Sequence, residues 1–289
     1  MIIAIASGKG GTGKTLVATN LAAIAKSGAV YLDCDVEEPN GHLFLNPDIR
    51  TTLNVTIPVP EVDESKCTHC GRCAKVCQFN ALIVGKEKVV VFPAMCHGCG
   101  SCMANCPTGA ITETPRTIGT IESGAFSNGI FLAGRLNIGE PMAPPVIRRL
   151  RDMGSMPLRG TAQSGHDTGV VIIDSPPGTS CPVIESIRES DFVVLVTEPT
   201  PFGLNDLKLA VQVVRKLNIP FGIVINKSGF DDNKTLEYCA QEDIQILAAI
   251  PHDMDIAKTY SRGGLLIDNQ KYKNIFTDLL IRIKESCHE

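Results

Sequence analysis

The chain has 289 residues, 44% of them hydrophobic and 20% charged, and its formal net charge is −4. This length and apolar content suit one large domain with a small insertion, and the acidic balance argues against a general nucleic-acid-binding surface. No run of about 18 uncharged apolar residues occurs, so no membrane-spanning helix is expected. No basic leader or cleavage site precedes the first apolar run, and we expect a cytoplasmic protein with reduced cysteines.

The first predicted elements are a buried strand over residues 2–6, a glycine-rich loop, and a helix from Lys14 to about Lys26. A loop between a strand and a helix is the context that phosphate binding requires, because the backbone N–H groups and the helix dipole attract an anion. Lys14 is expected to reach the β- and γ-phosphates, and the Thr15 hydroxyl to bind Mg²⁺. The loop glycines are Gly8, Gly10, Gly11 and Gly13.

Later apolar runs are continuous rather than alternating, which is typical of strands covered on both faces. They span residues 29–33, 169–174, 192–197, 221–226 and 246–250. Helical stretches such as residues 204–217 separate several of them. This alternation of strands and helices predicts a doubly wound, mainly parallel α/β sheet, in which ligands bind at the carboxyl ends of the strands.

Residues 63–113 break this alternation of strands and helices and contain two cysteine runs about thirty residues apart. Each run has the spacing C-x2-C-x2-C-x3-C, the pattern of two 4Fe–4S clusters in which the fourth cysteine of each run ligates the other cluster. The expected ligands are Cys67, Cys70, Cys73 and Cys106 for one cluster, and Cys77, Cys96, Cys99 and Cys102 for the other. The alternatives are a pair of zinc sites or disulfides, but two complete four-cysteine runs favour clusters.

This stretch resembles bacterial-type two-cluster ferredoxins over its whole length. It departs at Gln78, where a proline often follows the fourth cysteine. The stretch is too short and too polar for a substantial core, so we expect the clusters to hold it together. Residues 114–168, rich in Gly, Pro and Ser, are interpreted as a return path to the α/β sheet.

Residues 8–15, GKGGTGKT, resemble the deviant Walker A motif of the MinD/ParA/Mrp ATPases and of the nitrogenase iron protein. In that group the early lysine, here Lys9, crosses a dimer interface to the partner's nucleotide. The resemblance therefore implies an ATP-dependent homodimer in which Lys9 and Lys14 are catalytic. It implies two domains: a discontinuous P-loop ATPase domain over 1–62 and 114–289, and an inserted ferredoxin domain over 63–113.

The resemblance continues at the strand ends. Asp33-Cys34-Asp35 matches the acidic motif after the second strand, which implies that Asp33 lies beside Mg²⁺ and that Asp35 helps to position the attacking water. Residues 174–178, DSPPG, are similar to the Walker B motif and second switch, in which Asp174 supports Mg²⁺ and the Gly178 N–H senses the γ-phosphate.

Asn226 sits where the family has an asparagine that contacts adenine, and Pro251 belongs to a loop like the adenine-side loop of the Mrp-like branch. The nucleotide contacts implied by the resemblance are Gly10, Gly11, Thr12, Gly13, Lys14, Thr15, Gly178, Asn226 and Pro251.

Two features have competing interpretations. Cys181 follows the second switch, where the nitrogenase iron protein has a cluster ligand, but a small packed residue is the favoured interpretation. The apolar stripe of the last helix, residues 275–283, could contact a membrane, although packing on the sheet is favoured.

The sequence thus predicts a slow ATPase that uses ATP/ADP, Mg²⁺ and two 4Fe–4S clusters. Its expected function is ATP-gated electron transfer, or delivery of iron–sulfur or other metal cofactors, to an unidentified redox or metallocofactor partner protein. Two alternatives stay open. One is a MinD- or ParA-like spatial organiser with a redox-sensing insert, and the other is a scaffold whose clusters are cargo.

Overall fold

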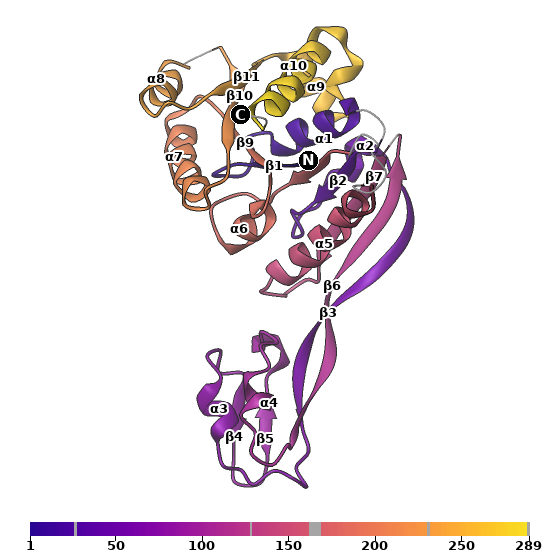
Figure 1. Ribbon diagram of the computed structural model, residues 1–289, viewed down its shortest axis with the longest axis vertical. Helices are drawn as coiled ribbons and strands as arrows, with labels where there is room; N and C mark the ends of the chain where they lie inside the picture. Colours follow the sequence, from indigo (N-terminus) through magenta and orange to yellow (C-terminus); the bar gives the residue numbers. More distant parts are fainter. Residues whose placement is uncertain (26–27, 128, 162–168, 230–231, 288–289) are drawn as a thin grey trace.

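A computed structural model describes residues 1–25, 28–127, 129–161, 169–229 and 232–287. The molecule has a layered α/β body and a smaller lobe that hangs from it on a long two-stranded ribbon (Figure 1). We call residues 63–110, which contain all eight cysteines of the two runs, the cysteine lobe.

Nine strands of the described residues form one sheet, in the order β11-β10-β9-β1-β8-β2-β7-β6-β3. All neighbours from β11 to β7 pair in parallel, and β6 and β3 add an antiparallel edge. The strands predicted from the sequence are β1 (Ile2–Ala6), β2 (Val30–Asp33), β8 (Val171–Asp174), β9 (Phe192–Thr197), β10 (Phe221–Ser228) and β11 (Ile246–Pro251). The expected mainly parallel α/β architecture is confirmed.

Helices cover both faces of the sheet, because buried parallel strands expose apolar side chains on each side. One face packs against α1 (Lys14–Ile24), α9 (Met254–Ser261), η2 (Leu266–Asp268) and α10 (Gln270–Ser286). The other packs against α5 (Pro144–Thr161), α6 (Cys181–Ile187), α7 (Pro201–Lys216) and α8 (Asn233–Gln241). A short helix, α2 (His42–Leu45), follows β2. The predicted end of the first helix, Lys26, lies outside the described residues.

The last helix packs on the sheet, as its apolar stripe predicts. Phe276, Leu279 and Ile283 of α10 are fully buried within the core of that face. Nowhere in the described parts of the chain is a helix both long enough and apolar enough to cross a bilayer.

Residues 114–168 do lead from the cysteine lobe back to the sheet, as predicted, but sequence analysis missed that the described part of this path is regular secondary structure. These residues complete β6 (Ile111–Phe126) and form β7 (Gly129–Leu136) and α5, while residues 162–168 lie outside the described residues. Sequence analysis did not predict these strands because glycine and proline are uncommon in β-strands. Pro115 of β6 lies opposite Pro58 of β3. Proline is tolerated there because each strand of a two-stranded ribbon has a free edge.

The ribbon is formed by β3 (Asp48–Val62) and β6, which pair antiparallel along their whole lengths. Only the second half of β6, from Gly119, also pairs with β7, so the remainder projects beyond the sheet (Figure 1). A β-bulge leaves Ile118 unpaired at this exit point. Beside the bulge, Arg116 forms an ion pair with Glu140, which precedes α5. The bulge and ion pair therefore mark the junction between ribbon and body.

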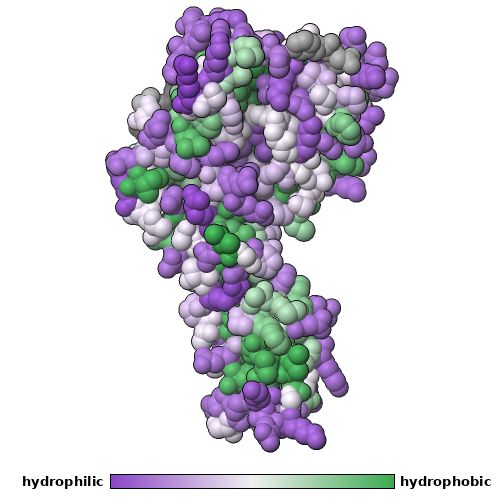
Figure 2. Space-filling model, turned by 180° about the vertical axis from the view of Figure 1, so that it is seen from behind, coloured by the Kyte–Doolittle hydropathy of each residue, from purple (hydrophilic) through white to green (hydrophobic). Residues whose placement is uncertain are grey.

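The cysteine lobe has little regular structure: α3 (Arg72–Val76), β4 (Leu82–Val84), β5 (Val89–Val91), η1 (Pro93–Met95) and α4 (Ser101–Ala104). Figure 2 shows a hydrophobic area on its surface. The exposed large apolar side chains of the lobe are Phe79, Ile83, Val90, Phe92, Met95 and Met103. A lobe that exposes so many apolar groups cannot owe its stability to a large core.

Candidate functional site

The phosphate-binding loop joins the end of β1 to the start of α1. Gly11 and Gly13 have φ angles of 76° and 96°, in the left-handed region that favours glycine. A Cβ added at Gly13 would lie 2.3 Å from Nδ2 of Asn226, so a larger residue is excluded there. The loop is therefore shaped by its glycines, and Lys14, at the start of α1, is almost fully buried beside them.

Two predicted acids end adjacent strands at the carboxyl edge of the sheet. Asp33 of β2 pairs in register with Asp174 of β8, and both side chains are buried. Oδ2 of Asp33 accepts hydrogen bonds from the backbone N–H groups of Asn40, at 3.0 Å, and Gly41, at 2.8 Å. The Tyr31 hydroxyl donates to Oδ2 of Asp174 at 3.0 Å.

The second oxygen of each acid is buried without a hydrogen-bond partner, as are the hydroxyls of Thr12 and Ser175. Burial raises the pKa of both carboxyl groups, and repulsion from Asp174 raises that of Asp33 further. A divalent cation would satisfy these oxygens and remove the repulsion, and Mg²⁺ prefers oxygen ligands of this kind. The residues present therefore fit a Mg²⁺ ion.

Asp35 lies just beyond β2 and is half-buried. Burial raises the pKa of its carboxyl group to about 6, although the positive charge of Lys14 acts in the opposite direction. The positive charge of Lys14 in the phosphate-binding loop acts on Asp35, as expected for an acid that positions the attacking water.

Gly178 has a φ of 98°, and its N–H donates to the Ser7 carbonyl at 3.0 Å. The group predicted to sense the γ-phosphate is thus bonded to the phosphate-binding loop in this structure. Cys181 is the first residue of α6 and is exposed, so its interpretation as a small packed residue is wrong.

Lys9 contacts an acid that sequence analysis missed. Its Nζ lies 2.5 Å from Oε1 of Glu198, whose Oε2 lies 3.0 Å from Nζ of Lys227. Glu198 directly follows β9 at the same edge of the sheet as Asp33 and Asp174. The position of Glu198 directly after a predicted strand could have marked it as a site residue, but no motif includes it.

An open hollow of about 880 Å³ adjoins the phosphate-binding loop. Asn226 and Pro251, the predicted adenine contacts, both line it. Nδ2 of Asn226 donates to the Thr12 carbonyl at 2.8 Å, which ties β10 to the loop. The remaining lining residues are Gly11, Gly13, Leu16, Lys227, His252, Asp253, Met254, Ile256, Ala257 and Tyr260. Largely apolar walls with a few polar groups are typical of small-molecule sites.

The eight cysteines of the two runs line two separate hollows in the cysteine lobe. The first, of about 340 Å³, is lined by Cys67, Cys70, Cys73 and Cys106. The second, of about 330 Å³, is lined by Cys77, Cys96, Cys99 and Cys102. All twelve cysteines of the chain lie within the described residues and are free thiols, which contradicts the disulfide alternative.

Backbone N–H groups point at several of these sulfurs. His69, Ala81, Gly98 and Ala110 donate to the sulfurs of Cys67, Cys77, Cys96 and Cys106 at 3.3–3.4 Å. Such hydrogen bonds stabilise thiolate charge and are among the factors that set cluster potentials. In each hollow, four cysteines line the walls and two of their sulfurs accept hydrogen bonds from backbone N–H groups, a donor set that fits a 4Fe–4S cluster.

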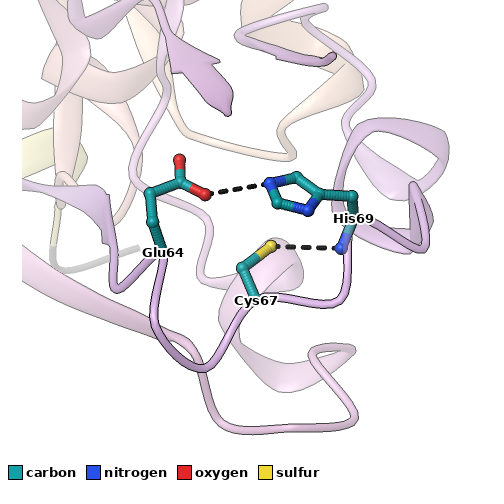
Figure 3. Close-up of side chains that lie close together, drawn as sticks. All are labelled: Glu64, Cys67 and His69. Atoms are coloured by element: carbon teal, nitrogen blue, oxygen red, sulfur yellow. Dashed lines mark hydrogen bonds and ion pairs between the residues drawn. The ribbon is translucent and has the colours of Figure 1, made fainter. Parts of the chain in front are cut away.

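Glu64, Cys67 and His69 lie close together (Figure 3), and Cys67 and His69 line the first hollow. Nε2 of His69 lies 3.0 Å from Oε2 of Glu64, whose Oε1 accepts from the Val89 N–H at 2.8 Å. His69 has a φ of 54°, whereas Gly98 takes the corresponding left-handed position in the second run. This conformation costs a non-glycine residue roughly 1 kcal/mol, so we attribute its persistence to the contact with Glu64.

The second hollow has different neighbours. The rings of Phe79 and His97 stack there with centroids 3.5 Å apart, and Glu113 of β6 also lines it. Glu113 thus lies at the second hollow, whereas Arg72 lines the first and Glu64 is paired with His69 beside it.

With this geometry established, comparison with known proteins identifies the family. Residues 3–267 match the family described as the CobQ/CobB/MinD/ParA nucleotide binding domain. The chain belongs to this family. The match begins in β1 and ends in η2, so it spans the phosphate-binding loop, both paired acids and the hollow beside the loop.

Several relatives match along almost the whole chain, and we name two. An uncharacterized protein of Methanocaldococcus jannaschii is 32% identical, and the match covers 96% of each protein. An iron-sulfur cluster carrier protein of Methanococcus maripaludis is 24% identical over 98% of this chain and 85% of that protein.

Among solved structures, the cell division ATPase MinD of Pyrococcus furiosus is similar, with a TM-score of 0.58 and 19% sequence identity. The similarity covers 98% of both chains. At this identity the comparison shows a shared fold, so the body is a MinD-like P-loop fold.

Proposed function

We propose that this CobQ/CobB/MinD/ParA-family protein binds and hydrolyses ATP with Mg²⁺ and forms a homodimer when ATP is bound. Lys14 and Thr15 would hold the phosphates and metal, Asp33 and Asp174 would support the metal, and Asp35 would orient the attacking water. The buried oxygens without partners at Asp33 and Asp174 support the metal assignment. The hollow containing Asn226 and Pro251 supports the adenine assignment.

We further propose that the cysteine lobe, together with the adjoining ribbon ends to residue 113, is an inserted ferredoxin-like domain with two 4Fe–4S clusters. When bound, the clusters would supply one-electron carriers. Each predicted cysteine quartet lines its own hollow, which supports this assignment. Two zinc sites could use the same two quartets, but without inorganic sulfide, which separates the two possibilities by analysis.

The observation that most supports a link between the nucleotide site and the cysteine lobe is the position of Ala133 in β7. It pairs with Asp33 of β2 on one side and with Glu122 of β6 on the other. A single strand therefore separates the proposed metal site from the strand that leads to the cysteine lobe. Adjustment of β2 on nucleotide binding would reach β6 through direct strand pairing.

We therefore infer that the protein couples its nucleotide state to electron transfer, or to delivery of an iron–sulfur or other metal cofactor, to a partner protein. The exposed apolar side chains of the cysteine lobe are suited to contact with such a partner. Delivery is favoured by one observation in particular, which is the similarity to an iron-sulfur cluster carrier protein along nearly the whole chain.

The test starts with anaerobically purified protein, in which we expect about eight irons per chain with equal inorganic sulfide. Stoichiometric zinc without sulfide would contradict the cluster proposal. Reversible reduction without iron loss would favour electron transfer, and ATP-dependent loss of clusters to an apo-acceptor protein would favour delivery. ATP-dependent recruitment to vesicles or DNA would instead favour a spatial organiser.

A further inference from the structure

Glu198 connects two lysines that flank the proposed nucleotide site. Its Oε1 accepts from Nζ of Lys9 at 2.5 Å, and its Oε2 accepts from Nζ of Lys227 at 3.0 Å. Nζ of Lys227 also lies 3.5 Å from the Gly11 carbonyl in the phosphate-binding loop. One carboxylate therefore joins the loop after β1 to the loop after β9 and to the end of β10.

The surrounding backbone fixes this arrangement. Thr200, the N-cap of α7, donates its N–H to the Glu198 carbonyl at 2.8 Å. Gly203 packs so closely that an added Cβ would lie 2.3 Å from the same carbonyl oxygen. Lys227 has a φ of 56°, a strained conformation for a lysine. Glu198 and Lys227 are thus held in position rather than left free at the surface.

The charges have a different role from stabilising the fold. The Glu198 side chain is 14% exposed, whereas those of Lys9 and Lys227 are 29% and 46% exposed. Burial raises the pKa of the Glu198 carboxyl, but hydrogen bonds from both lysines outweigh burial and lower it, so Glu198 is ionised at neutral pH. Ion pairs with exposed lysines add little to stability. A mostly buried carboxylate between two cations instead resembles a bound anion.

The triphosphate of ATP would compete directly with Glu198, because it brings several negative charges to the loop that carries Lys9. It would attract both lysines and repel the carboxylate. Lys9 is also the residue expected to reach the partner's nucleotide in the dimer. Glu198 of its own chain and the partner's phosphates would then compete for the ammonium of Lys9.

We propose that Glu198 is a positioning residue that holds Lys9 within its own chain when nucleotide is absent, and so opposes dimerisation until ATP binds. This inference rests on the ATP-dependent dimer of the proposed function. Glu198 takes the place of phosphate beside Lys9 until ATP binds. The strength of the Glu198–Lys9 ion pair therefore sets how readily Lys9 becomes free for the dimer interface.

The experiment measures dimer dissociation constants by sedimentation, with and without a non-hydrolysable ATP analogue, for the full-length protein containing its clusters. Glu198→Gln keeps the shape and removes the charge, and we expect it to tighten the analogue-bound dimer about three- to fivefold, the range of one partly exposed ion pair. The matched control is Glu242→Gln, which removes a carboxylate paired with Arg215 on α7, away from the site. It should leave the constant unchanged.

A double-mutant cycle separates action through Lys9 from a general charge effect. In a Lys9→Ala background, Glu198→Gln should no longer tighten the dimer. Without nucleotide, Glu198→Gln should make the Lys9 amine more reactive to an acylating reagent, while the thermal unfolding midpoint stays close to that of the unchanged protein. A purely structural role for Glu198 would lower the midpoint instead.

Three results would overturn the inference. If the unchanged protein dimerises with the analogue and Glu198→Gln dimerises equally or more weakly, Glu198 does not oppose dimerisation. Equal tightening with and without Lys9 would mean that Glu198 does not act through Lys9. If neither protein dimerises, the dimer in the proposed function is wrong and this inference falls with it, an outcome distinct from the other two.

Discussion

Asp33 and Asp174 lie directly opposite each other on adjacent parallel strands, and each has one buried carboxylate oxygen without a hydrogen-bond partner. Burying two neighbouring carboxyl groups is costly unless a cation or protons compensate them. The nucleotide-free body therefore carries a local instability at the place where Mg²⁺ would bind. A site built in this way trades stability for function.

This relationship predicts that Asp33→Asn stabilises the nucleotide-free protein. Because the folded protein raises the pKa of Asp33, folding takes up protons at this group. The destabilising contribution of Asp33 to the free energy of unfolding therefore grows as the pH rises above about 3.9, the pKa of an aspartate in the unfolded chain. We expect the unfolding midpoint to rise by about 2–4 °C at pH 7.5, or about 1 kcal/mol, and by less at pH 5. Mg-ATP should no longer stabilise the variant. A lower midpoint at both pH values would mean that the hydrogen bonds to Asn40 and Gly41 matter more than the charge.

Asp35 should act in hydrolysis rather than in binding. Asp35→Ala should bind the ATP analogue with unchanged affinity but cleave ATP at least about tenfold more slowly, a barrier increase of about 1.4 kcal/mol. Because the pKa of its carboxyl group is raised to about 6, the rate of the unchanged protein should fall as pH drops through that value. Asp35→Ala should lack this fall. Single-turnover rates from pH 5 to 8 provide the measurement, and unchanged turnover would move the role to another residue.

Sequence analysis succeeded where the pattern was local. The continuous apolar runs fixed the parallel strands because a strand buried on both faces needs apolar side chains at every position. The phosphate-binding loop was predictable because its glycines, Lys14 and Thr15 are adjacent in the sequence. The grouping of Cys106 with Cys67, and of Cys77 with Cys96, followed from spacing, and each pair lines a common hollow.

The features that were missed depend on contacts between distant segments. The ribbon has exposed residues on both sides and prolines at Pro58 and Pro115, so neither periodicity nor propensity favours a strand there. Glu198 gains its partners only because β9 ends beside the phosphate-binding loop. The Glu64–His69 contact requires the left-handed backbone at His69, which the sequence does not indicate.

The two hollows should give their clusters different potentials. Glu113 places a negative charge at the second hollow, which disfavours an added electron there. Glu113→Gln should therefore raise one of the two reduction potentials, that of the second cluster, by about 20–50 mV and leave the other nearly unchanged. Glu87→Gln, at an exposed position of the same lobe that lines neither hollow, is the control. Equal shifts of both potentials, or none, in a potentiometric titration would contradict a local role for Glu113.

Nucleotide state and cluster potential should be coupled through the ribbon junction. Strand β7 links the strand of Asp33 to β6, and the Arg116–Glu140 ion pair fixes β6 where it leaves the body. If nucleotide binding shifts a cluster potential, linkage requires that reduction change nucleotide affinity by the same free energy. A shift of about 60 mV in a one-electron couple corresponds to about tenfold in affinity.

The measurement is a potentiometric titration with and without a non-hydrolysable ATP analogue, alongside analogue affinities for the oxidised and reduced protein. We expect both quantities to change and to agree through linkage. Glu140→Gln should reduce the coupling while retaining the clusters and nucleotide binding, because it weakens the only ion pair that the described residues form at the junction. Glu242→Gln again serves as the control. If neither potential nor affinity changes in the unchanged protein, the clusters respond to nucleotide only with a partner present, or they are cargo held by a scaffold.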